Sequence, residues 1–138
     1  MPFVKIWIHT VWTTKDRNPL LSYKTRIMLF KHMRDYANDK GYDIDYINGV
    51  SDHVHCLLSL KANQSLSDAL GLIKGESSYW INKNHLTEEK FSWQSEFYAA
   101  SVGTVQLKNL REYIKNQEAH HREMDFQTEM LKLEKRIK

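Results

Sequence analysis

The chain has 138 residues, of which 41% are hydrophobic and 27% are charged, with a formal net charge of +3 at pH 7. This length suits a single domain spanning residues 1–138, and the mild positive charge permits a nucleic-acid partner without favouring indiscriminate duplex binding. One cysteine excludes a disulfide framework. Because we also find no apolar run of membrane-spanning length and no signal-peptide pattern, we expect a cytoplasmic protein.

Residues 3–14 are rich in β-branched and aromatic side chains and predict a first strand. Alternation along a strand divides these side chains between two faces. The core face is expected to carry Val4, Ile6 and Ile8, and the opposite face Lys5, Trp7, His9 and Val11. The second set is basic and aromatic, which suits stacking on single-stranded nucleic acid, although ordinary packing would also explain Trp7.

A helix is expected from the cap residue Ser22 to the stop at Gly41. Its apolar stripe is expected to be Tyr23, Ile27, Phe30 and Ala37. A second strand follows over residues 42–50.

The third expected strand, residues 51–60, holds the most informative pattern in the chain. Val54, Cys56, Leu58 and Leu60 alternate on one face, which predicts a core behind them. His53 and His55 share the other face, roughly 6.5–7 Å apart, where two imidazoles could turn toward one metal ion. The same spacing would also fit two exposed strand histidines.

The second half of the chain continues the alternation of helices and strands. Ser65 and Asp68 form a capping-box pattern that opens a helix to about Asn82, with Leu66, Leu70, Ile73 and Trp80 facing inward. A fourth strand is expected over residues 96–103, followed by a helix from Thr104 that packs through Leu107, Leu110 and Ile114. A final helix is expected to dock through Phe126, Met130, Leu133 and Ile137.

The resulting order, β-α-β-β-α-β followed by helices, predicts an α+β, ferredoxin-like split βαβ fold. Right-handed crossovers place both central helices on one face of an antiparallel sheet. The first and third strands are then central, and the histidine pair is expected on the uncovered face.

Two histidines leave most positions of a divalent ion open, which suits a catalytic site better than a structural zinc site. The helix after the fourth strand presents Tyr113 and Gln117 four residues apart, on one face. A tyrosine oxygen beside a metal-bound phosphate is a plausible nucleophile, because the ion withdraws charge from phosphorus. A surface tyrosine and a solvated amide would also fit this pattern.

His-hydrophobe-His on a strand, followed by Tyr-x-x-x-Gln on a helix, resembles the small single-tyrosine transposases of the HUH class, found in bacterial and archaeal insertion sequences. The resemblance covers nearly the whole chain. It runs through residues 11–21, 51–55, 73–78 and 91–103 before it reaches Tyr113 and Gln117.

The resemblance implies a DNA transposase that cuts and rejoins single-stranded DNA beside hairpins at the ends of its element. Tyr113 would attack the phosphate to leave a 5′-phosphotyrosine and a free 3′-OH. His53, His55 and Gln117 would hold Mg²⁺ or Mn²⁺, although His120 and His121 could compete for the ion. Related domesticated proteins act on chromosomal palindromic repeats, and the sequence is also compatible with that role.

The DNA hairpin is expected to contact four residues, namely Lys5, Trp7, Arg17 and Lys74. A solvated lysine would also explain Lys74. The resemblance further implies a homodimer whose active sites are shared. In the sequence, Gly103 could provide a hinge for the tyrosine helix, although a monomer with this helix folded back on its own sheet would also fit.

Two other functions remain compatible with the sequence. One is a non-catalytic ferredoxin-like domain that binds single-stranded RNA or DNA, although its usual aromatic-rich strand is absent. The other is a metal-dependent nuclease that uses activated water.

Overall fold

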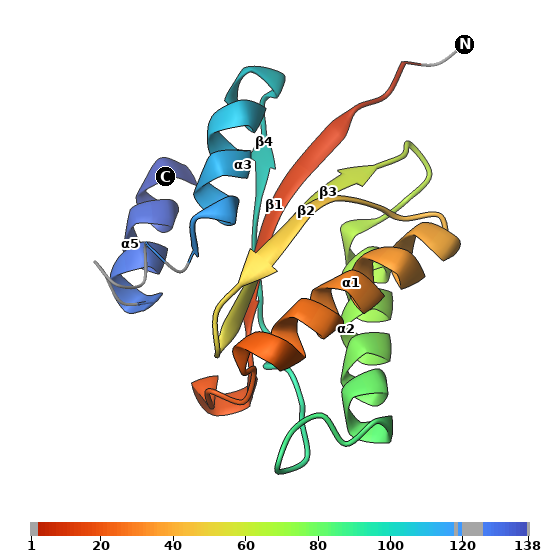
Figure 1. Cartoon of the computed structure of the whole chain (residues 1–138). Helices are drawn as coiled ribbons and strands as arrows, with labels where there is room; N and C mark the ends of the chain where they lie inside the picture. Colours follow the sequence, from red (N-terminus) through yellow and green to blue (C-terminus); the bar gives the residue numbers. More distant parts are fainter. Residues whose placement is uncertain (1–2, 118, 120–125, 138) are drawn as a thin grey trace.

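The computed structural model describes residues 3–117, 119 and 126–137. Four antiparallel strands form one sheet in the order β2-β3-β1-β4. The strands are β1 (Ile6–Thr13), β2 (Asp43–Gly49), β3 (His53–Leu60) and β4 (Tyr98–Val102). The first and third strands are therefore central, and the ferredoxin-like prediction is confirmed (Figure 1).

Two helices, α1 (Tyr23–Asp39) and α2 (Leu66–Lys83), cover one face of the sheet (Figure 1). Both begin at the predicted cap residues. The Ser22 hydroxyl accepts a hydrogen bond from the Thr25 amide at 3.3 Å, and the Ser65 hydroxyl accepts one from the Asp68 amide at 3.0 Å. These bonds satisfy amides that have no partner within the first helical turn.

The main core lies between this helical layer and the sheet. Its buried side chains include Trp12, Leu29, Met33, Val54, Cys56, Leu58, Leu70 and Ile73. The predicted β3 face is confirmed, as is the inward position of Ile8, which packs against this core. Val4 and Ile6 were predicted to face the core, but they are 38% and 40% exposed because β1 extends beyond the helical layer there.

The predicted stripe of α1 is half wrong. Phe30 and Ala37 are buried as expected, whereas Tyr23 and Ile27 are 63% and 50% exposed. The buried face is rotated to Leu29, Phe30, Met33 and Ala37, with Thr25 at its start. The aromatic ring of Tyr23 made an outward position resemble a packing position.

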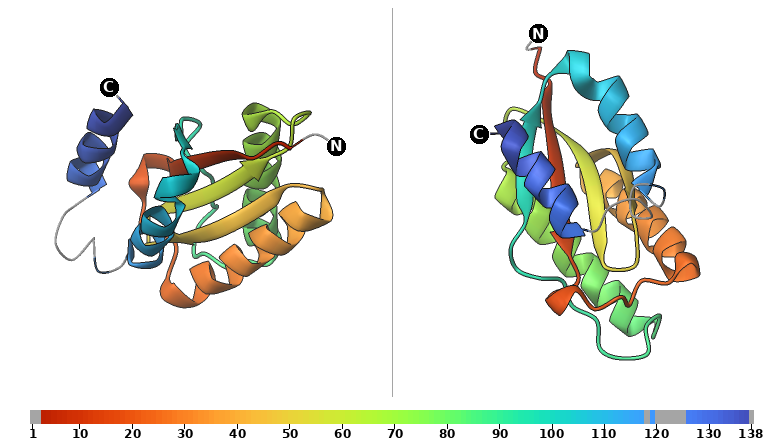
Figure 2. Two further views of the ribbon diagram at one scale, coloured as in Figure 1. Left: turned by 90° about the horizontal axis from the view of Figure 1, so that it is seen from above. Right: turned by 90° about the vertical axis from the view of Figure 1, so that its left-hand side faces the viewer.

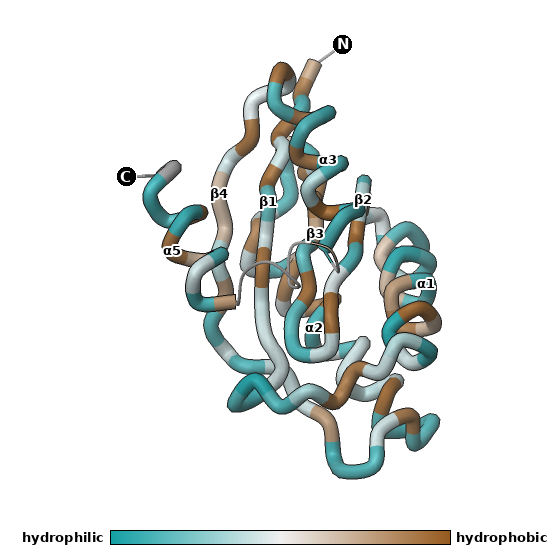
Figure 3. The backbone as a smooth tube through the Cα atoms, turned by 60° about the vertical axis from the view of Figure 1, so that its left-hand side comes forward, coloured by the Kyte–Doolittle hydropathy of each residue, from teal (hydrophilic) through white to brown (hydrophobic). Residues whose placement is uncertain are grey.

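The opposite face of the sheet is also covered, which corrects the expectation of an open face around the histidines. A short 3₁₀ turn, η2 (Thr104–Gln106), leads into α3 (Leu107–Lys115), and α5 (Phe126–Ile137) lies beyond it. Figure 2 shows both helices on the side away from α1 and α2. In Figure 3 hydrophobic and hydrophilic positions alternate along both helices, as expected when one face packs on a sheet.

The second layer has its own small apolar cluster. Leu57 of β3 is fully buried against Leu107 and Ile114 of α3, and Leu110 packs at its edge. The predicted stripe of this helix is therefore confirmed. Leu133 of α5 is 4% exposed, so the last helix docks as predicted, while the side chain of Ile137 lies outside the described residues.

Within the described ranges, every helix is too short or too polar to cross a membrane.

Candidate active site

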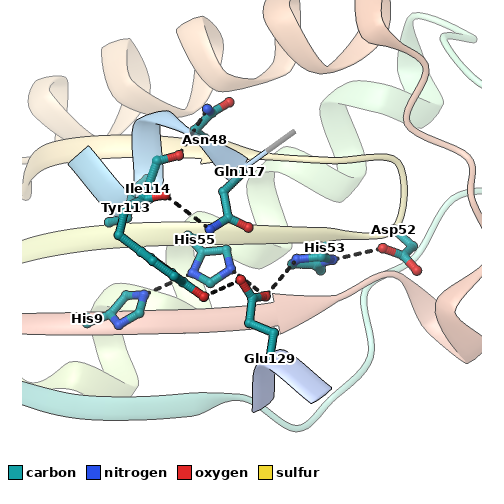
Figure 4. A network of polar contacts seen from close by, with 9 residues as sticks. All are labelled: His9, Asn48, Asp52, His53, His55, Tyr113, Ile114, Gln117 and Glu129. Carbon is teal, nitrogen blue, oxygen red and sulfur yellow. Dashed lines mark hydrogen bonds and ion pairs between the residues drawn. The ribbon is translucent and has the colours of Figure 1, made fainter. Parts of the chain in front are cut away.

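The two histidines of β3 lie at the centre of a buried polar network (Figure 4). Both side chains are fully buried, so the predicted exposure of this pair is wrong, because α3 and α5 cover them. Their ring centroids are 5.3 Å apart. The strand alternation that places Val54 and Cys56 in the main core places both imidazoles under the second layer.

Each histidine is held through its Nδ1 atom by a second polar side chain. His53 Nδ1 lies 2.8 Å from Asp52 Oδ1, and His55 Nδ1 lies 2.9 Å from His9 Nε2. A neutral His53 that donates from Nδ1 to Asp52 presents the lone pair of Nε2 to the site, and His55 does the same when its Nδ1 donates to His9. This arrangement is the one in which histidines ligate metals.

Burial and the neighbouring carboxylates shift the pKa of His53 in opposite directions. Burial alone lowers the pKa, but hydrogen bonds to the carboxylates of Asp52 and Glu129, together with their negative charges, outweigh it and raise the pKa. Protons therefore compete with a metal ion for His53 at mildly acidic pH.

Glu129 of α5 completes a three-residue cluster with the histidines. Its Oε1 atom lies 3.2 Å from His55 Nε2 and 3.4 Å from His53 Nε2. The three ligand atoms lie within 4.8 Å of one another, and all three residues are buried. Sequence reasoning missed Glu129 because it lies outside any recognised motif.

Tyr113 of α3 lies over the same cluster. Its hydroxyl donates a hydrogen bond to Glu129 Oε2, and its ring lies 5.7 Å from that of His55. The tyrosine thus faces the histidines of its own chain. Figure 4 shows the phenol, the imidazoles and the carboxylate converging from α3, β3 and α5.

Gln117 follows α3 by two residues and is fully buried. Its Nε2 donates to the Tyr113 carbonyl at 3.4 Å, whereas its Oε1 has no hydrogen-bond partner among the described residues. Burying an amide carbonyl oxygen without a hydrogen-bond partner costs free energy of folding. Its orphaned oxygen lies near the histidines, where a cation would satisfy it (Figure 4).

Two polar contacts with β2 fix α3 on the sheet. Asn48 Nδ2 donates to the carbonyls of Ile114 and Lys115 at 3.1 and 3.0 Å, which caps the end of the helix. Arg111 forms a two-pronged ion pair with Asp45 at 2.7 and 2.9 Å. Both contacts set the height of Tyr113 above the sheet.

The cluster fits a divalent ion by distance and by chemistry. Neighbouring ligands of an octahedral ion with bonds of ~2.1 Å lie about 3 Å apart, close to the 3.2 and 3.4 Å from Glu129 to the histidines. Imidazole nitrogens with a carboxylate and an amide oxygen suit Mn²⁺ well and Mg²⁺ acceptably.

A family model described as "Transposase IS200 like" matches residues 3–117, which include both histidines, Tyr113 and Gln117. The chain belongs to the IS200-like transposase family. The chain is 26% identical over 114 residues to the ISDra2 transposase TnpA of Deinococcus radiodurans, covering 79% of this chain and 81% of that protein.

Two solved structures share the fold of this IS200-like transposase. A crystal structure of a candidate transposase from Deinococcus radiodurans matches with a TM-score of 0.68 at 24% identity, covering 84% of this chain and 93% of that one. A REP-associated tyrosine transposase bound to a REP hairpin matches with a TM-score of 0.66 at 17% identity, covering 88% and 72%.

Two hollows in the transposase are lined by residues that contact the cluster, Tyr113 in one and Phe126 in the other. One, of about 450 Å³, lies between β4 and α3 and is lined by Tyr113, His9, Tyr98 and Asn109 among others. The other, of about 840 Å³, runs between β4, the 3₁₀ turn η1 (Lys15–Arg17) and α5. Its wall includes Arg17, Phe97 and Phe126.

The four residues predicted to contact DNA lie in different surroundings. Lys5 and Arg17 are exposed, the latter with its guanidinium 5.5 Å from the Phe126 ring. Trp7 is half-buried beneath α3, between Lys5 and Arg111. The ammonium of Lys74 donates to the carbonyls of Gln94 and Ser95 at 2.8 and 3.3 Å, and burial lowers its pKa.

Two site residues besides Glu129 were missed in these roles. His9 was placed on the correct face, but only the β1–β3 register, which sets His9 opposite Leu57, brings its ring to His55. Asp52 adjoins His53 in sequence, and that adjacency was a usable signal. His120 and His121, the predicted competitors for the ion, lie outside the described residues.

Proposed function

We propose that this IS200-like transposase cleaves and rejoins single-stranded DNA at hairpin-marked element ends through a 5′-phosphotyrosine intermediate. The observation that carries the proposal is the position of the Tyr113 hydroxyl over the buried His53, His55 and Glu129 cluster. A nucleophile beside a metal-binding cluster is the arrangement that phosphoryl transfer requires.

In this mechanism His53, His55 and Gln117 hold Mg²⁺ or Mn²⁺. A bound ion would polarise the scissile phosphate and orient it for attack. Asp52 and His9 keep the two imidazoles turned toward the site, and α3 holds the Tyr113 hydroxyl over the cluster. Tyr113 displaces the 3′ oxygen and becomes joined to the 5′ phosphate, while the free 3′-OH remains available for rejoining.

The hollow lined by Tyr113 and the one lined by Phe126 both include Tyr98, and together they offer a path for an unpaired strand. We propose that single-stranded DNA passes between β4 and α5, where Tyr98, Phe97 and Phe126 offer aromatic surfaces. Arg17 and Lys5 are exposed and would contact phosphates. Trp7 is half-buried, so only part of its ring could stack on a base, and Lys74 would reach DNA only by leaving the carbonyls of Gln94 and Ser95.

A trapping assay tests this function. The protein is mixed with end-labelled single-stranded DNA that contains an imperfect hairpin, with Mn²⁺ or Mg²⁺, and then denatured. We expect a DNA–protein adduct that disappears with chelator and in the His53→Ala, His55→Ala double variant. DNA binding without any adduct would favour the non-catalytic alternative, and cleavage without an adduct would favour a nuclease that uses water.

We further propose that the protein acts as a homodimer with active sites shared between subunits. In the described chain Tyr113 faces its own histidines, so exchange requires α3 to release the Asp45–Arg111 ion pair and the Asn48 contacts. The edge strands β2 and β4 offer surfaces on which two sheets could pair.

Mixing two inactive proteins distinguishes shared from separate sites. His53→Ala, His55→Ala protein and Tyr113→Phe protein are each expected to form no adduct. Heterodimers should regain adduct formation when one subunit supplies the histidines and the other the tyrosine. No recovery in verified heterodimers would show that each chain builds its own site.

A further inference from the structure

The carboxylate of Glu129 occupies a position between the histidines and the tyrosine. Glutamate is rarely fully buried unless it is paired, yet Glu129 is 1% exposed. Its Oε1 faces His53 Nε2 and His55 Nε2, while its Oε2 accepts the hydrogen bond from Tyr113 (Figure 4). One side chain therefore connects the two groups on which the proposed reaction depends.

We infer that Glu129 is a further catalytic residue, whose Oε1 ligates the divalent ion and whose Oε2 orients Tyr113 and accepts its proton. This inference rests on the proposed function and deepens it, since it adds a residue from α5 to a site otherwise built from β3 and α3. It also gives the last helix a chemical role in addition to its packing through Leu133.

The metal-ligand role of Glu129 Oε1 follows from the hydrogen bonding of the histidines. With Nδ1 of His53 donating to Asp52, and Nδ1 of His55 donating to His9, both neutral rings turn a lone pair toward Glu129 Oε1. In that neutral state neither ring donates to the carboxylate, so each nitrogen lone pair would face Glu129 Oε1, at 3.4 Å from His53 and 3.2 Å from His55, in a buried site. A cation between them removes this repulsion and compensates the buried carboxylate.

The proton-acceptor role follows from the position of Glu129 Oε2, which accepts the hydrogen bond from Tyr113. As the bond between Tyr113 Oη and phosphorus forms, the bond from phosphorus to the 3′ oxygen breaks. The phenol proton passes to Glu129 Oε2 and from there to the departing 3′ oxygen, so protons balance without a further reactant. The reverse transfers serve rejoining. Such proton transfer contributes about 10²–10⁴-fold to rate in enzymes.

The helix that carries Glu129 is anchored on both sides of the carboxylate. Phe126 packs with its ring 4.5 Å from that of His53, and Leu133 is buried one turn beyond Glu129. These contacts place Glu129 over the histidines rather than in solvent. The same contacts are also compatible with another role, in which α5 only covers the site and must leave before DNA enters.

Glu129→Gln is the decisive variant because it keeps the shape of the side chain but removes its charge and its ability to take a proton. Glu112→Gln is the matched control, since Glu112 is exposed on α3 beside Tyr113 in sequence. Thermal melting of all proteins verifies folding. Mn²⁺ affinity is measured by calorimetry without DNA, and adduct formation is timed at saturating Mn²⁺ with the hairpin DNA.

We expect Glu129→Gln to weaken Mn²⁺ binding about tenfold or more, and to slow adduct formation at least ~100-fold at saturating Mn²⁺. Glu112→Gln should match the wild type in both. Unchanged Mn²⁺ affinity or an unchanged rate overturns the inference, and faster adduct formation would show that α5 is a cover. If the wild type forms no adduct, the proposed function fails, while the Mn²⁺ titration still tests the ligand role.

Discussion

Replacing Asp52 with asparagine should weaken metal binding without disturbing the fold. Asp52 Oδ1 lies 2.8 Å from His53 Nδ1, and this carboxylate fixes the tautomer that presents Nε2 to the site. Loss of such an outer partner typically costs 10–100-fold in metal affinity, or about 1.4–2.7 kcal/mol. Since the Asp52 side chain is 24% exposed and asparagine retains an acceptor oxygen, we expect the lower end, about tenfold.

The assay is calorimetric titration of Mn²⁺ into Asp52→Asn protein at pH about 8, where protons compete with the ion less than at mildly acidic pH. Asp43→Asn is the matched control, because Asp43 is exposed at the start of β2. At mildly acidic pH the difference should shrink, because removing Asp52 also removes a cause of the raised pKa of His53. Equal Mn²⁺ affinities of the wild type and Asp52→Asn at the higher pH would refute the reasoning.

The surroundings of Gly49, Cys56 and Ile114 lead to further predictions. In urea unfolding, Gly49→Ala should destabilise the fold by several kcal/mol, because the new Cβ would lie 2.2 Å from the His53 carbonyl oxygen. The control Gly71→Ala should be neutral or stabilising by up to ~1 kcal/mol, because Gly71 lies within α2 with open space around it. Burial raises the pKa of Cys56 to about 12, so its thiol should react with alkylating reagents only after unfolding. Because the unfolded thiol ionises first, Cys56 should lower stability by up to ~1.4 kcal/mol per pH unit above pH 9, and this contribution should be absent in Cys56→Ala. Ile114→Ala should cost about 2–5 kcal/mol in the same unfolding assay, since the Ile114 side chain of α3 is fully buried against Leu57 of the sheet, and a cost below 1 kcal/mol would contradict that packing.

The order of strands and helices could be predicted because alternation and caps are local signals. Ser22 and Ser65 cap the helices that they predicted, and the alternation of Val54, Cys56 and Leu58 placed His53 and His55 on a common face. The burial of that face could not be predicted, because it depends on where α3 and α5 dock. Docking is a tertiary property that no short pattern encodes.

The residues of the candidate site could likewise be predicted only in part. The pair of histidines and the Tyr113–Gln117 spacing are short-range patterns, and both lead to residues that the structure brings together. Glu129 follows Tyr113 by 16 residues on another helix, and its carboxylate becomes informative only once it is seen against the histidines. Lys74 shows the converse, since a basic residue beside a glycine resembled a phosphate contact but donates to backbone carbonyls.

The most direct test of the central claim is to map the tyrosine that becomes joined to DNA. Adduct formed with hairpin DNA is digested with nuclease and trypsin, and the modified peptide is identified by mass spectrometry. We predict a nucleotide on peptide 112–115, which contains Tyr113, and its loss in Tyr113→Phe but not in Tyr98→Phe, whose ring lies 5.7 Å from His9. Modification of Tyr98, or an adduct that persists in Tyr113→Phe, would contradict the account.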